Sequence, residues 1–199
     1  MEAEACRWQG QLSDAARAAR TAAGVLVPGT ASWYRSFESA VTTESRLDDF
    51  DGAVRRYEAL LAATPAADAA GARAIALCAT ARVLFQGGRY DLAEQLMEEI
   101  RRAAEEPERV GPRALAEAQR LRGARARHVG DVAGDLRWYA ASLRAFEEAG
   151  DARQACNARV SVGFAWFEVG ALDTAREELE RARRDSAPLW LQTVDSRAR

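Results

Sequence analysis

The most informative absence from this sequence is lysine, because all 28 of its basic residues are arginine. A phosphate-binding loop of the Gly-Lys-Ser/Thr type is therefore excluded. Mechanisms in which a lysine forms a Schiff base or acts as a general base are excluded for the same reason.

Cysteine is scarce and scattered. The three cysteines, Cys6, Cys78 and Cys156, lie far apart and form no CxxC pair. An odd number without metal-ligand spacing predicts neither a disulfide framework nor a zinc site. Cys78 and Cys156 fall in apolar helical segments, where a free cysteine usually packs as a small core residue. We expect a reducing, cytoplasmic compartment.

Long apolar runs are missing as well, and none approaches the length needed to span a bilayer. The first residues, 1–5, are acidic and lack the apolar stretch of a signal peptide, so we expect no leader. The net charge of −2 and the pI of about 5.7 provide no overall attraction to nucleic acid or to an anionic membrane. These features predict a protein without membrane partners and with little tendency to bind nucleic acid.

Strand signals are almost absent, whereas strong helix formers dominate. No run of alternating β-branched residues is bounded by turns. Alanine, leucine, glutamate and arginine fill the segments between helix breakers. Those breakers include Pro28-Gly29, Pro65, Gly87-Gly88, Pro107, Gly111-Pro112, Gly130, Gly150-Asp151, Gly170 and Pro188. Because each segment has the length of one helix, the sequence predicts an all-α fold.

Five short, similar segments recur about forty residues apart. They begin at Gly10, Asp48, Gly88, Gly130 and Gly170, which are separated by 38, 40, 42 and 40 positions. A fixed period of this size is typical of helical repeat arrays, in which each repeat packs on its neighbours. Such arrays usually form a binding surface rather than an active site.

The clearest repeat is the last one. Residues 152–169 are predicted to form one helix, which Gly170 ends with a left-handed conformation. A second helix, about 172–185, places apolar residues at helical spacing on one face. Position 163 is expected to require a residue as small as glycine, because the two helices must approach closely where they cross.

The spacing of these residues resembles the tetratricopeptide repeat (TPR). The resemblance is carried by Val162-Gly163, Trp166, Gly170, Leu172, Ala175, Leu179 and Ala182, and residues 74–107 match almost as well. It implies a right-handed α–α superhelix extending over residues 1–199. We expect a partial repeat at 1–29, repeats at about 30–66, 67–108, 109–150 and 151–186, and a partial terminal helix at 187–199.

The segment 145–151 resembles the linker of roughly forty-residue TPR variants. Those variants are common in large multidomain bacterial signalling proteins, such as serine/threonine kinases. Neither end of the chain looks like a polar capping repeat. We therefore expect a fragment of a larger protein, or an oligomer formed through the uncapped ends. Trp8 and Trp190 belong to these incomplete end repeats and could be exposed.

Some residues depart from the TPR pattern. Asp135 stands where a small alanine is usual, and it could instead cap a helix that starts late.

Two runs of Glu and Arg, 98–102 and 177–181, predict solvated helix faces with weak ion pairs.

No catalytic or metal-binding constellation emerges. The single histidine, His128, lies at a predicted helix end before Gly130, where a cation interacts with the last carbonyls. The segment 48–52 lacks the carboxylate order of a calcium loop and is expected to cap the following helix. We therefore expect no enzyme activity, no metal and no cofactor.

A TPR array binds partners through its first helices, which line a concave groove. The positions of those helices that avoid the packing face predict a groove rich in arginine and phenylalanine, formed by Arg35, Arg46, Arg82, Phe85, Gln86, Arg120, Arg127, Asn157, Phe164 and Phe167. Guanidinium groups suit carboxylates and aromatic rings suit apolar anchors, so the expected partner is a protein or peptide with acidic and apolar residues. The predicted function is a protein–protein interaction scaffold. The alternative is a regulatory module whose curvature responds to a ligand or peptide and controls an attached catalytic domain.

Overall fold

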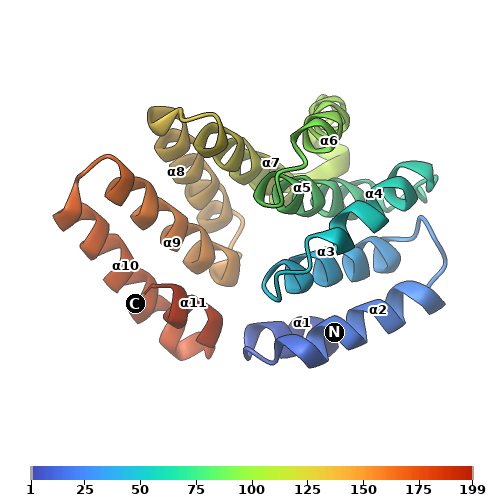
Figure 1. Ribbon diagram of the computed structural model, residues 1–199, viewed down its shortest axis with the longest axis horizontal. Helices are drawn as coiled ribbons and strands as arrows, with labels where there is room; N and C mark the ends of the chain where they lie inside the picture. The colour runs from blue at the N-terminus through green and yellow to red at the C-terminus, as the bar shows by residue number, and fades with distance from the viewer. Residues whose placement is uncertain (1, 199) are drawn as a thin grey trace. The chain divides into compact units, whose positions relative to one another are not determined.

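The structure, a computed structural model, describes residues 2–198, without the side chain of residue 193 (Figure 1). Within that range the chain is all-helical and has no strand, which confirms the predicted all-α class. The helices are α1 (Glu2–Trp8), α2 (Leu12–Val25), α3 (Ala31–Ser45), α4 (Asp51–Ala62), α5 (Ala70–Gln86), α6 (Tyr90–Ala103), α7 (Pro107–His128), α8 (Val132–Glu148), α9 (Ala152–Glu168), α10 (Leu172–Ser186), the short 3-10 helix η1 (Ala187–Leu189) and α11 (Gln192–Arg197).

The recurrent segments are helix-ending turns. Their first residues all have a left-handed backbone, with φ of 78° at Gly10, 59° at Asp48, 73° at Gly88, 76° at Gly130 and 80° at Gly170. In each turn the next N–H donates to the carbonyl four residues before the left-handed residue, at 2.8–3.0 Å. This 6→1 hydrogen bond ends a helix in the Schellman manner. Asp48 adopts a conformation that aspartate tolerates better than most side chains.

The last hairpin forms as predicted, since α9 and α10 differ from the expected ranges by one residue each. The contact between them is close: a Cβ on Gly163 would lie 2.7 Å from Leu179 Cδ2. Forty residues earlier, a Cβ on Gly123 would lie 3.0 Å from Tyr139 Cδ2. The same small-against-large contact thus recurs with the period of the sequence.

The helices form two compact units. Unit 1 contains Met1–Arg7 and Gln11–Ala118, and unit 2 contains Trp8–Gly10 and Gln119–Arg199. The chain passes from one unit to the other near the end of α1 and again inside α7, which also has a kink at Gly111, where φ is 80°. The expected repeat boundaries and the superhelical path stay predictions.

In unit 1, α3 packs against α2, α4 and α5, and α5 also packs against α4 and α6. The largest fully buried side chains include Tyr34, Leu60, Leu77, Leu84 and Leu96. Cys78 lies in this interior, as predicted.

Gly71 permits a close approach between α5 and the segment before the kink of α7. A Cβ at position 71 would overlap the carbonyl oxygen of Val110, a backbone atom that cannot rotate away. Helix propensity alone would make Gly71→Ala stabilising by about 1 kcal/mol. We expect the overlap to dominate and to lower the free energy of unfolding of unit 1 by about 1–3 kcal/mol, measured by urea denaturation. Gly24→Ala is the control, because a Cβ there meets nothing within 4 Å. If both variants gained stability, the close approach would be absent.

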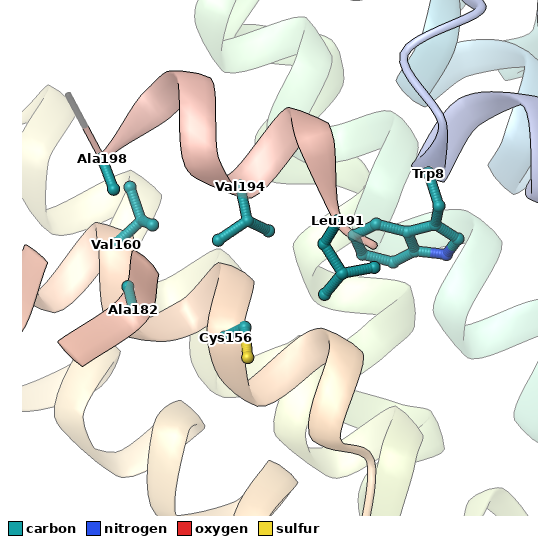
Figure 2. Packing of buried hydrophobic residues seen from close by; sticks show 7 residues of the cluster. All are labelled: Trp8, Cys156, Val160, Ala182, Leu191, Val194 and Ala198. Atoms are coloured by element: carbon teal, nitrogen blue, oxygen red, sulfur yellow. The ribbon is translucent and has the colours of Figure 1, made fainter. Parts of the chain in front are cut away.

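In unit 2, an apolar cluster joins Trp8 to the C-terminal part of the chain. Its buried residues are Trp8, Cys156, Val160, Ala182, Leu191, Val194 and Ala198. Figure 2 shows the Trp8 indole beside Leu191, with Val194 and Cys156 nearby. Cys156 is a core residue as expected, but the suggestion that Trp8 is exposed is wrong, because only 4% of its surface remains accessible. Trp190 is 81% exposed, as suggested.

The C-terminal segment is more broken than the predicted helix. η1 ends at Leu189, Trp190 follows it with a φ of 56°, and α11 begins only at Gln192. None of the helices formed by residues 2–198 is long and apolar enough to cross a membrane.

Candidate functional site

The predicted groove residues divide equally between the two units. Unit 1 contains Arg35, Arg46, Arg82, Phe85 and Gln86, whereas unit 2 contains Arg120, Arg127, Asn157, Phe164 and Phe167. Neither unit by itself therefore brings the whole set together.

Two of these residues are buried and support packing. Phe85 is almost inaccessible, and its ring lies 6.5 Å from that of Tyr90. Arg120 lies over the ring of Phe146 at 4.8 Å and donates through Nη2 to Gln154 Oε1 at 2.9 Å. A ring-stacked guanidinium that also binds an amide is stable inside a protein. Neither side chain presents a surface to a partner in this structure, contrary to the expectation from helix projection.

The other predicted residues of unit 1 remain accessible. Arg35 and Gln86 are exposed, and Arg46 and Arg82 are half-buried. Within residues 2–198, neither Arg35 nor Arg82 forms an ion pair, so their guanidinium groups are available to an acidic partner.

Unit 2 has a distinct apolar end. Because α8 and α9 pack side by side and are joined through residues 149–151 alone, they run antiparallel, and the start of α8 lies near the end of α9. The turn into α10 follows directly. Exposed apolar side chains gather on these segments, and we call Val129, Val132, Phe164, Phe167, Val169 and Leu172 the apolar end.

The two phenylalanines stand out within the apolar end. Phe164 is 39% exposed and Phe167 is 59% exposed, although most of the preceding residues of α9 are buried. Their spacing of three positions places them on one face of the helix. Large aromatic side chains that packing would normally bury are thus left accessible side by side.

A polar pair lies near the same end. Arg127, at the end of α7, donates through Nη2 and Nε to Asp135 Oδ2 at 3.0 and 3.2 Å, and its guanidinium stacks over Tyr139 at 5.1 Å. Asp135 is buried, and its Oδ1 has no hydrogen-bond partner among the described residues. Burial raises the pKa of the Asp135 carboxyl, while the charge of Arg127 opposes that shift.

The suggestion that Asp135 caps α8 is wrong. Asp131 performs that role, because its Oδ1 accepts a hydrogen bond from the Gly134 N–H at 2.8 Å. Asp135 lies one turn later and pairs with Arg127 instead. The segment 48–52 does form a capping turn, in which Asp49 Oδ1 accepts from the Gly52 N–H at 3.2 Å.

No metal-ligand cluster is found in the part of the chain that the structure describes. No group of three or more His, Cys, Asp or Glu side chains there could hold a metal ion. His128 ends α7 and is exposed.

Sequence reasoning missed a buried arginine of unit 2 that faces several carboxylates. Arg159 is buried on α9, and its guanidinium contacts the carboxylates of Glu147, Glu178 and Asp185. Glu178 had been assigned to a solvated face, whereas it turns toward Arg159. The sequence does carry one sign of this site, because Arg159 is surrounded by the apolar residues Ala155, Cys156, Ala158 and Val160. A charge among buried apolar residues is tolerated only when it is paired inside the protein.

Comparisons with known proteins name no relative. No family model matches the sequence, and no curated protein matches it. The resemblance to the tetratricopeptide repeat therefore rests on the residues of this chain alone.

Proposed function

We propose that this chain is a TPR-like protein-interaction module, and that unit 2 binds a peptide or protein partner through Phe164 and Phe167. The observation that carries the proposal is the exposure of these two aromatic rings on one face of α9. Clustered aromatic side chains supply most of the binding energy at many protein interfaces. Exposed apolar patches commonly mark such interfaces.

The recurrence of the helix turns supports the repeat architecture. Left-handed turns at the period of the sequence, and two equivalent glycine contacts forty residues apart, fit stacked helical hairpins. The same turn also follows α8 at Gly150 and η1 at Trp190, so the glycine contacts are the more specific support. The right-handed superhelix and the bacterial signalling context belong to the same proposal.

The partner combines apolar anchors with an acidic group. The rings of Phe164 and Phe167 take the anchors, and the 41% exposed side chain of Arg127 lies near enough to the same end to attract a carboxylate. Because Arg127 already pairs with Asp135, its contribution is secondary to that of the two rings.

The test is a selection of peptides from a random library on the wild-type chain. We expect the selected peptides to lose about tenfold or more in affinity for Phe164→Ser/Phe167→Ser, measured by isothermal titration calorimetry. Serine removes the rings without burying a new polar group, since both positions are accessible.

The matched control is Val25→Ser/Val27→Ser. These two residues are also exposed and apolar, but they belong to unit 1. Unchanged affinity for the phenylalanine variant would locate binding elsewhere. An equal loss in both variants would indicate non-specific adhesion and would likewise contradict the proposal.

A further inference from the structure

Unit 2 contains a cavity at the opposite end of α9 from the two phenylalanines. Its volume is about 300 Å³, at the small end of the range for ligand sites. The end of α8, the start of α9, the end of α10 and η1 surround it. The residues that line it are Glu147, Gly150, Ala152, Ala155, Cys156, Arg159, Asp185 and Leu189.

The polar side of the cavity has a surplus of negative charge. Arg159 is 5% exposed, and it donates through Nη1 to Glu178 at 2.9 Å and through Nη2 to Glu147, while its Nε lies 3.6 Å from Asp185. One guanidinium thus faces three carboxylates. Arg181 lies 3.8 Å from Asp185 and is largely exposed to solvent.

Arg159 is poorly suited to binding an anion. Each of its three nitrogens already faces a carboxylate, so an incoming anion would have to displace one. Glu147 and Asp185 are better suited to binding a cation, because each lines the cavity, is roughly half exposed and can accept further hydrogen bonds.

The helix ends around the cavity favour a cation too. α8 and α10 both end there, and the carbonyl groups of a helix C-terminus carry partial negative charge. The N-terminus of α9 also lies there, and it is capped, since Asp151 Oδ1 accepts from the Gln154 N–H at 3.1 Å. The last carbonyls of α8 in turn accept from the N–H groups of residues 149–151, so the two carboxylates, more than the helix ends, determine the preference for a cation.

The remaining wall is apolar. Ala152, Ala155 and Leu189 provide methyl and methylene groups, and the Cys156 thiol lies among them. Burial raises the pKa of this thiol, and the charge of Asp185 adds to the effect. The protonated thiol therefore acts as part of the apolar wall.

We propose that this cavity binds a small organic cation, in which an amine, amidine or guanidine group is attached to a compact apolar body. The cationic group would lie against Glu147 and Asp185, and the body would cover Ala152, Ala155 and Leu189. The same chemistry could come from a free small molecule or from an arginine side chain of a peptide. Binding here would give the regulatory alternative a ligand, at a site separate from the proposed peptide surface.

The experiment is a titration followed by the backbone amide resonances of residues 150–159, with three probes of equal size and different charge. Benzamidine is the cation, benzamide the neutral analogue and benzoate the anion. We expect saturable shifts with benzamidine, affinity lower by about fivefold or more with benzamide, and no binding of benzoate. A short amidated peptide with a central arginine tests the second source; tighter binding of that peptide than of benzamidine would assign the site to a peptide side chain.

Four variants locate the binding. Glu147→Gln should lower benzamidine affinity about fivefold, whereas the control Glu148→Gln, at an exposed neighbour outside the lining, should leave it unchanged. Ala152→Leu fills the cavity without altering a charge and should abolish binding. Phe164→Ser/Phe167→Ser should bind benzamidine as the wild type does, so the two proposals fail independently. Equal affinity for all three probes, preference for benzoate, or undiminished binding by Ala152→Leu would overturn the inference.

Discussion

Trp8→Ala is expected to lower the free energy of unfolding of unit 2 by about 3–5 kcal/mol, the cost of removing a large aromatic side chain from a packed interior. Trp8 is 4% exposed, and its cluster includes Leu191, Val194 and Cys156 (Figure 2). Small neighbours such as Ala182 and Ala198 cannot expand to fill the space. The loss should be largest for α11, whose six residues depend on this cluster for burial.

The measurement is urea denaturation combined with amide hydrogen exchange of residues 152–198. Trp190→Ala is a matched control, because it removes the same side chain from an 81% exposed position of the same unit and should change stability by less than about 0.5 kcal/mol. If the two variants behaved alike, Trp8 would not be packed as described. Unchanged exchange in α11 with Trp8→Ala would be equally incompatible with the cluster.

Local features of the fold could be predicted from the sequence because they depend on neighbouring residues. Gly170 ends α9 where a left-handed residue was expected, and Gly163 meets Leu179 as the repeat spacing required. Even the irregular second turn follows the same rule, with Asp48 in the left-handed conformation. Periodic apolar positions and helix-ending turns are encoded within a few residues of where they act.

Long-range contacts could not be predicted in this way. Nothing near Trp8 in the sequence indicates that its ring packs against residues more than 140 positions away. Arg159 likewise contacts Glu147 and Asp185 from two other helices, and its location on an apolar face was the only local sign. Projection of the helices also predicted that Phe85 and Arg120 lie on the surface. It could not show that the ring of Tyr90 lies near Phe85, or that the Gln154 amide of another helix accepts a hydrogen bond from Arg120.

Glu44→Ala is expected to lower the free energy of unfolding of unit 1 by about 3–5 kcal/mol, since it would leave a half-buried guanidinium without its carboxylate. Glu44 is fully buried on α3. Arg56 of α4 donates to it through both terminal nitrogens, at 2.5 and 2.9 Å, and Arg20 of α2 approaches at 3.2 Å. Gly52 makes room for this arrangement, because a Cβ there would overlap Glu44 Oε2. One carboxylate thus connects three consecutive helices.

Urea denaturation of two further variants distinguishes the loss of the Glu44–Arg56 ion pair from the general effect of removing a glutamate. Glu98→Ala removes a carboxylate that pairs only with exposed arginines, and it should leave stability nearly unchanged. Glu44→Met/Arg56→Met should be less damaging than Glu44→Ala alone, because two apolar side chains leave no unpaired charge beside the core. If the double variant were the less stable, the attraction between the charges would outweigh their desolvation, and this pair would stabilise the hairpin directly. If Glu44→Ala matched Glu98→Ala, water would reach Arg56 freely, and α3 and α4 could not be packed as closely as their contacts require.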